Sequence, residues 1–214
     1  MARLAQVSKS LITGDSGAIE VSMQVPDVMP LSAVAVVAHP HPLFGGSMDN
    51  KVVTSMARAF TDAGAVTWRF NFRGVGKSAG AHDEGRGETE DMLRVIRHAC
   101  ELNPGLPLWL AGFSFGGAVT LAANGQVHAS EMILIAPALQ RLTLWKDVSI
   151  GGVAPDSTLI IHGELDETVP LSESLNWARP RNIPVAVVPG ADHFFHLRLH
   201  IIKKIASRWL PEKA

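Results

Sequence analysis

One short stretch of the sequence has residue types and spacing suited to nucleophilic catalysis. Residues 112–117 read GFSFGG, which contains the pattern G-x-S-x-G centred on Ser114. An apolar run, 107–113, leads into this stretch, and a helical pattern of small residues, 115–125, follows it. A tight strand-to-helix turn strains the serine backbone and requires glycine nearby. The amino terminus of the following helix stabilises negative charge. We therefore expect Ser114 to be a nucleophile.

A serine hydroxyl needs a base to take its proton and an acid to orient that base. In α/β enzymes with this serine turn, the acid and then the histidine follow the serine along the chain. The turn after the apolar run 157–163 offers Glu164, Asp166 and Glu167. We choose Asp166 as the acid because it falls in the turn just beyond the strand end. A helix N-cap at Asp166 is compatible with that role.

Three histidines follow the last apolar run, 184–190. His193 lies in the loop directly after the run, where a base could reach Ser114. His196 and His200 continue at helical spacing, which is more typical of surface or packing positions. Asp192 is an alternative acid, although its place next to His193 makes it hard for its carboxylate to turn back onto that ring. The sequence thus predicts a Ser114, His193 and Asp166 triad.

A second stretch, VGKS at 75–78, ends like a phosphate-binding loop. The pattern G-x-x-x-x-G-K-[ST] requires glycine at position 71, where this chain has Asn71. A phosphate loop also requires a helix to begin at the Lys-Ser pair. The glycine-rich segment after Ser78 has no apolar period, so nucleotide binding is not predicted.

Length and composition fit a single globular domain spanning 1–214. The chain has 214 residues, 47% of them hydrophobic, and a net charge of −1. A balanced charge does not favour nucleic acid as a partner. Cys100 is the only cysteine, and no run is long enough for a signal peptide or a membrane span. We therefore expect a cytoplasmic protein with no membrane partner, and the sequence leaves its oligomeric state open.

Short apolar runs alternate with helical patterns along the chain. The runs are continuous rather than alternating, which indicates strands buried on both faces of a parallel sheet. An amino-terminal hairpin, 3–12 and 18–25, is expected at the sheet edge around the turn 14–17. The expected fold is a doubly wound α/β domain with an eight-stranded, mostly parallel sheet and helices on both faces. Its buried strands are 33–39, 65–72, 107–113, 131–137, 157–163 and 184–190, and its helices are 48–64, 88–105, 115–125 and one that begins after His193 and includes 202–209.

Together these stretches resemble the α/β-hydrolase superfamily, and more narrowly the small lidless bacterial hydrolases related to dienelactone hydrolase. The resemblance spans nearly the whole chain and rests on AHPHPLFGGSMDNKVV, RFNFRGVGKSAG, GFSFGG, HGELDETVP and GADHFF, in the family's order. It implies that Ser114, Asp166 and His193 are nucleophile, acid and base. It also implies that NFRGVGKSAG is a structural turn beside the site.

The chain departs from the family pattern in two places. Dienelactone hydrolase uses a cysteine nucleophile where this chain has Ser114, so that substrate is not implied. Many α/β-hydrolases have His-Gly after the third strand, where this chain has HPHP at 39–42. We expect the oxyanion hole to use the backbone N–H of Phe115 and one from this loop. Proline has no N–H, which leaves His41, Leu43 or Phe44, of which we favour His41.

His39 and His41 could also form half of a metal site. No third ligand is evident in the sequence, and a role in ordering the loop is the better interpretation. The sequence therefore predicts no metal and no organic cofactor.

The position of a lid is occupied by a short insertion at about 138–156. Its glycines and proline leave room for at most one short helix, so we expect an open cleft with a minimal lid or none. The predicted apolar wall is made of Leu43, Leu142 and Trp145, with Leu139 and Leu144 beside them.

The predicted function is that of a serine hydrolase acting on small esters or thioesters through an acyl-enzyme. Two alternatives stay open at this point. One is an inactive α/β-hydrolase fold used to bind a ligand or a partner. The other is an acyltransferase or perhydrolase with the same triad.

Overall fold

The fold is built on one eight-stranded sheet with the strand order β1-β2-β4-β3-β5-β6-β7-β8. The computed structural model describes residues 6–27, 29–140 and 153–211. β1 pairs with β2, and β2 with β4, in antiparallel fashion, whereas all the other neighbouring strands are parallel. The strands are β1 (Gln6–Gly14), β2 (Gly17–Val25), β3 (Ala33–Ala38), β4 (Ala65–Phe70), β5 (Leu108–Phe113), β6 (Glu131–Ile135), β7 (Thr158–Gly163) and β8 (Val185–Val188). The predicted sheet and edge hairpin are confirmed.

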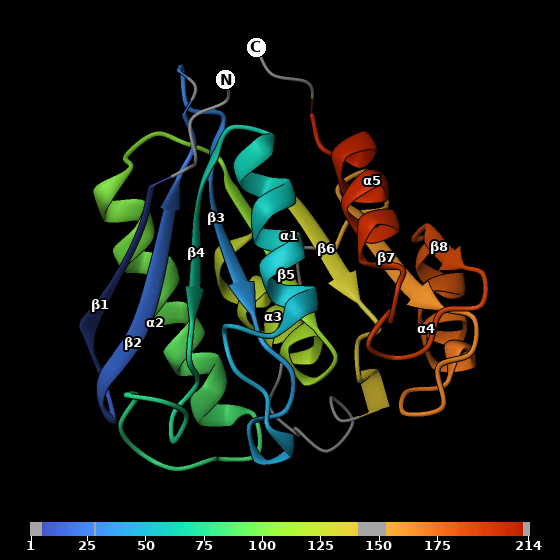
Figure 1. Ribbon diagram of the computed structural model, residues 1–214, viewed down its shortest axis with the longest axis horizontal. Helices are drawn as coiled ribbons and strands as arrows, with labels where there is room; N and C mark the ends of the chain where they lie inside the picture. The colour runs from blue at the N-terminus through green and yellow to red at the C-terminus, as the bar shows by residue number, and fades with distance from the viewer. Residues whose placement is uncertain (1–5, 28, 141–152, 212–214) are drawn as a thin grey trace.

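Helices cover both faces of the sheet (Figure 1). One layer contains α1 (Lys51–Asp62) and α5 (Leu199–Trp209), which pack against each other. The other contains α2 (Arg86–Leu102), α3 (Phe115–Val127) and α4 (Leu171–Ala178). No helix among the described residues is long and apolar enough to cross a membrane.

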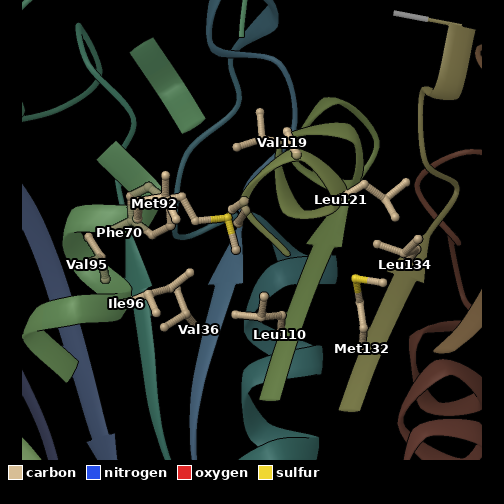
Figure 2. Close-up of a cluster of buried hydrophobic side chains, with 14 of the residues drawn as sticks. Val36, Phe70, Met92, Val95, Ile96, Leu110, Val119, Leu121, Met132 and Leu134 are labelled. Carbon is tan, nitrogen blue, oxygen red and sulfur yellow. The ribbon is translucent and has the colours of Figure 1, made fainter. Parts of the chain in front are cut away.

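The parallel strands β3 to β8 read as continuous apolar runs because each of them contributes side chains to two core clusters. Successive side chains of a strand point to opposite faces. In β3, Val34 and Val36 therefore join the cluster under α2 and α3, whereas Ala35 and Val37 join the cluster under α1 and α5. Figure 2 shows the first cluster, in which Val36 and Leu110 of the sheet face side chains of α2 and α3.

The starts of two helices differ most from those expected from the sequence. α1 begins at Lys51 rather than at 48, because the Asn50 side chain caps it by accepting the Val52 N–H at 2.9 Å. The last helix begins at Leu199 rather than directly after His193. The residues between them form a loop in which Phe195 and Leu197 have φ of 53° and 59°, a backbone conformation that interrupts a helix.

The loop after β4 is a structural turn, as the resemblance implied. The Asn71 side-chain amide donates to Glu20 Oε2 at 2.8 Å. Ser78 Oγ donates to the Asn71 carbonyl at 2.6 Å and accepts the Glu20 N–H at 2.9 Å. No helix begins at Ser78, since α2 starts only at Arg86. These contacts tie the loop to β2 and account for Ser78 without a phosphate.

A buried ion pair fastens the same loop to α2. Arg73 donates to both carboxylate oxygens of Asp91, from Nε at 3.1 Å and from Nη2 at 2.9 Å. The Arg73 backbone N–H adds a third bond to Asp91 at 3.0 Å. Burial alone would lower the pKa of Arg73, but its hydrogen bonds to Asp91 raise it on balance. A Cβ on Gly87 would lie 1.8 Å from Arg73 Nη1, so the pair also requires glycine there.

Breaking this ion pair should destabilise the protein strongly. In Asp91→Asn the Arg73 charge stays buried while its main counter-charge is lost, which should cost about 3 kcal/mol of the free energy of unfolding. The measurement is urea denaturation followed by circular dichroism. Lys9→Ala is the control, because its pair with Asp49 is more than half exposed and should be worth less than about 1 kcal/mol. Equal losses in the two variants would contradict this prediction.

Candidate active site

Ser114 occupies a sharp turn between β5 and α3. Its φ is 56° and its ψ is −118°, a strained conformation for a residue with a side chain. A Cβ on Gly112 would lie 2.2 Å from the Gly116 carbonyl oxygen, and a Cβ on Gly116 would lie 2.3 Å from the His39 carbonyl oxygen. Both approaches are closer than any side chain tolerates, so only glycine fits at these two positions.

Three loops bring the predicted triad residues together at the carboxyl ends of β5, β7 and β8. These ends meet along one edge of the sheet because the strands are parallel (the lower edge in Figure 1). His193 Nε2 lies 3.0 Å from Ser114 Oγ, and His193 Nδ1 lies 2.7 Å from Asp166 Oδ2. All three side chains are buried. Both distances allow a hydrogen bond, so the proton of Ser114 has a path to the imidazole.

The Asp166 carboxylate is held by hydrogen-bond donors on every side. Oδ1 accepts the backbone N–H groups of Thr168 and Val169 at 2.9 and 2.8 Å. Oδ2 lies 2.7 Å from His193 Nδ1 and 3.3 Å from His162 Nε2. Burial alone would raise the pKa of Asp166, but the bonds from His162, His193 and Val169 outweigh it and hold the pKa well below its usual value. Asp166 is therefore ionised at neutral pH.

His162 supports this carboxylate, and the sequence reasoning missed it. Its Nε2 faces two acceptors, the Val169 carbonyl at 2.9 Å and Asp166 Oδ2, so this nitrogen carries the proton. Its Nδ1 lies 2.8 Å from Ser174 Oγ of α4. The available signal was a histidine at the end of a strand that is otherwise apolar, just before the turn that carries the acid.

The other carboxylates and histidines of these turns lie away from the proton path. Asp192 accepts the His196 N–H at 3.0 Å, and its Oδ2 lies 2.5 Å from His196 Nδ1, in an exposed pair. Glu164 accepts the Gly190 N–H at 2.8 Å at the surface. His200 is exposed on α5. The structure thus brings Asp166, and neither Asp192 nor Glu164, to His193.

The predicted oxyanion residues lie side by side. Phe115 is the first residue of α3, so its amide belongs to the first turn, whose N–H groups point out of the helix. The His41 ring lies 4.8 Å from the Phe115 ring. Of the alternative donors, the Leu43 N–H points to His41 Nδ1 at 3.3 Å and the Phe44 N–H to the His41 carbonyl at 3.2 Å. The assignment of Phe115 and His41 as oxyanion donors stays a prediction.

His39 orders two loops rather than facing a metal. Its Nδ1 lies 2.6 Å from the Pro40 carbonyl, and its Nε2 accepts the Phe72 N–H at 3.0 Å. Burial lowers its pKa to about 4, against the smaller opposing effect of the Pro40 bond, so the ring is neutral. Within residues 6–27, 29–140 and 153–211, no group of three His, Cys, Asp or Glu side chains is placed to hold a metal ion.

A second histidine that the sequence did not single out lies behind the loop of His41. His82 Nδ1 lies 2.8 Å from Oε1 of Glu88, a fully buried carboxylate. The His82 ring is 4.8 Å from the His41 ring and 5.6 Å from the Phe115 ring. No sequence pattern pairs a loop histidine with a residue six positions later in the next helix.

Two of the predicted wall residues, Leu142 and Trp145, lie outside the described residues, as do Leu144 and most of the insertion at 138–156. Leu43 is 69% exposed in the loop after β3. Leu139 is buried in the core instead of lining a cleft, which corrects its expected place in the apolar wall.

The ionised Asp166 should make stability depend on pH. Its pKa lies below the ordinary value of 3.8 in the folded state, so its contribution is present above about pH 4 and is lost as the pH falls further. The difference in free energy of unfolding between the wild type and Asp166→Asn should therefore shrink from pH 7 to pH 3, measured by urea denaturation. Asp192→Asn, at an exposed pair, should show a much smaller change. A constant difference for Asp166→Asn would contradict the prediction.

Comparisons with known proteins identify the family of this chain. Residues 45–153 match the family model described as serine aminopeptidase, S33. An uncharacterized protein of Rickettsia prowazekii is 30% identical over 190 residues, which are 85% of this chain and 79% of that protein.

Two solved structures are similar over almost the whole chain. An α/β serine hydrolase homologue from Coxiella burnetii is 37% identical with a TM-score of 0.85, covering 95% of this chain and 97% of that one. A Xanthomonas campestris protein, described as an α/β serine hydrolase without a lid, is 34% identical with a TM-score of 0.87, covering 98% and 97%. The chain therefore belongs to the α/β-hydrolase superfamily, as a member of the serine aminopeptidase S33 family of serine hydrolases.

Proposed function

We propose that this protein hydrolyses small carboxylic esters or thioesters with Ser114, His193 and Asp166 as its catalytic triad. The observation that carries the proposal is the buried line of hydrogen-bonding distances from Ser114 Oγ through the His193 ring to Asp166. A protein that only binds a ligand has no need for a strained serine in contact with an oriented imidazole, so the geometry favours an enzyme over a receptor.

The proposed reaction passes through an acyl-enzyme. His193 Nε2 takes the proton of Ser114 as Oγ attacks the carbonyl carbon, and the carbonyl electron pair moves to its oxygen. The amide of Phe115 and a donor from the His41 loop bind this oxyanion. His193 then gives its proton to the leaving alcohol or thiol, and the acyl group stays on Ser114. Water then attacks the acyl-enzyme in the same way, with His193 again as the base, and the carboxylic acid product leaves Ser114.

Asp166 acts through His193 in this scheme. Its charge stabilises the imidazolium that forms when His193 accepts the proton, and its bond to Nδ1 keeps Nε2 facing Ser114. Because the pKa of Asp166 is lowered, the carboxylate keeps its charge throughout the cycle.

The proposed substrates have short acyl chains. Each additional CH₂ contributes about 0.8 kcal/mol only while an apolar wall remains to cover it. Because the lid is minimal or absent, we propose that kcat/KM for p-nitrophenyl esters peaks at roughly two to six acyl carbons. We also propose that hydrolysis needs no cofactor and that the protein has no nucleic-acid or membrane partner.

The nucleophile can be tested directly. Ser114→Ala should lower kcat by roughly four to six orders of magnitude, as expected when a triad acts as a unit, and should abolish covalent labelling by a fluorophosphonate probe. The circular dichroism spectrum should be unchanged, because alanine fits the space of Ser114 and the lost side-chain contact to His193 does not hold the sheet or helices together. Activity near that of the wild type in the folded variant would refute the proposed triad.

The acid can be tested against its two neighbours. Asp166→Asn should leave His193 poorly oriented and lower kcat by about 10⁴. Glu164→Gln and Asp192→Asn should each lower kcat by less than about tenfold, because neither carboxylate contacts His193. A larger loss for Asp192→Asn than for Asp166→Asn would show that Asp166 is not the acid of the triad.

A further inference from the structure

Two phenylalanines beside the site are unusually exposed. The chain has eight phenylalanines, all within the described residues, and six of them are buried in the cores. The exceptions are Phe44, which is 81% exposed, and Phe194, which is 46% exposed. Each ring contacts a histidine of the site, Phe44 with His41 and Phe194 with His193.

The two rings lie on opposite sides of the serine turn. In the sheet, β3 is a direct neighbour of β5 on one side, whereas β8 is reached through β6 and β7 on the other. Phe44 is in the loop after β3 and Phe194 in the loop after β8. The turn that carries Ser114 therefore has one exposed aromatic ring on each flank.

Phe194 lies directly against the proposed base. Its ring is 5.2 Å from the His193 ring at an interplanar angle of 82°, and 6.0 Å from the Phe113 ring. Two residues in left-handed conformations follow it, and one of them, Leu197, is 92% exposed. Phe195 is buried in the core and anchors this loop, whereas Phe194 and Leu197 present apolar surface to water beside the site.

Phe44 has a matching position against the loop of the oxyanion donors. It ends the short 3-10 helix η1 (Pro42–Phe44), and Gly45 closes this turn with a φ of 77°. Its ring lies 4.8 Å from the His41 ring, which in turn lies 4.8 Å from the ring of Phe115.

The proposed chemistry places different parts of a substrate on these flanks. The imidazolium of His193 must give its proton to the oxygen or sulfur of the leaving group, so that group lies on the His193 side. The acyl part stays bonded to Ser114 and points away from the leaving group, so it lies on the other flank, that of the oxyanion loop. An aromatic ring offers apolar surface to either part, and offset or edge contacts to another ring add to it.

We propose that Phe194 binds the apolar leaving group of the substrate and that Phe44 binds the acyl group. This inference rests on the proposed esterase function and deepens it. It assigns the substrate class as esters that are apolar on both sides of the bond, with an aromatic or alkyl alcohol part. Both residues would then set specificity without taking part in the proton transfers.

The test uses two ester series and reads ratios of kcat/KM, which cancel any general damage to the triad. Benzyl acetate against methyl acetate varies the leaving group, with acetate release measured. p-Nitrophenyl hexanoate against p-nitrophenyl acetate varies the acyl group. In Phe194→Ala the benzyl-to-methyl ratio should fall about tenfold, and the hexanoate-to-acetate ratio should stay within about twofold. In Phe44→Ala the opposite pattern is expected.

Leu102→Ala is the matched control. Leu102 is 58% exposed at the end of α2, in the segment that leads to the amino end of β5, so both ratios should equal those of the wild type. Phe194→Leu and Phe44→Leu keep apolar volume, so each should lower its ratio less than the alanine variant does. If an alanine variant fails to fold, the leucine variant is measured in its place.

The outcomes separate this inference from the proposed function. If the wild type cleaves these esters and both alanine variants keep both wild-type ratios, the assignment is overturned while the esterase function stands. If each variant lowers both ratios equally, the division between leaving group and acyl group is overturned. If the folded wild type cleaves no ester and takes no fluorophosphonate label, the proposed function fails and this inference fails with it.

Discussion

The close approach of main chain to main chain around Ser114 is the constraint on which the site depends. The first turn of α3 packs so tightly against the ends of β3 and β5 that no side chain fits at Gly112 or Gly116. This packing holds Ser114 in its strained conformation and sets the Phe115 ring 4.8 Å from the His41 ring. Any residue larger than glycine would push α3 away and separate Ser114 from its neighbours, so the position of Ser114 depends on glycine at these two places.

Buried polar bonds then fix the loops that meet this turn. His39 ties the loop after β3 to the loop after β4 through the Phe72 N–H, and Arg73 ties the latter to α2 through Asp91. On the other flank, His162 and two backbone amides hold Asp166. A buried charge or polar group without partners is costly, so each of these groups holds its loop in one conformation. The loops are thereby ordered before any substrate binds.

Much of the fold and part of the site followed from local patterns in the sequence. Continuous apolar runs report burial on both faces, which is why the parallel sheet and its helical layers could be predicted. The glycines around Ser114 signal a turn that other residues cannot form. Asp166 and His193 were chosen as candidates because each falls just after a strand, and the carboxyl ends of parallel strands meet at one edge. These features depend on residues close together in the chain.

Other features depend on contacts between distant segments, and only the tertiary structure decided them. The sequence by itself determined the sheet, the serine turn and the candidates for acid and base. It did not show that His162 supports Asp166, that His82 pairs with Glu88 behind His41, or that Asp192 turns to His196. It also did not distinguish Phe44 and Phe194 from the six buried phenylalanines. The physical reason is that burial and hydrogen-bond partners are set by packing across the whole sheet, whereas a sequence pattern reports only periodicity and local backbone preference.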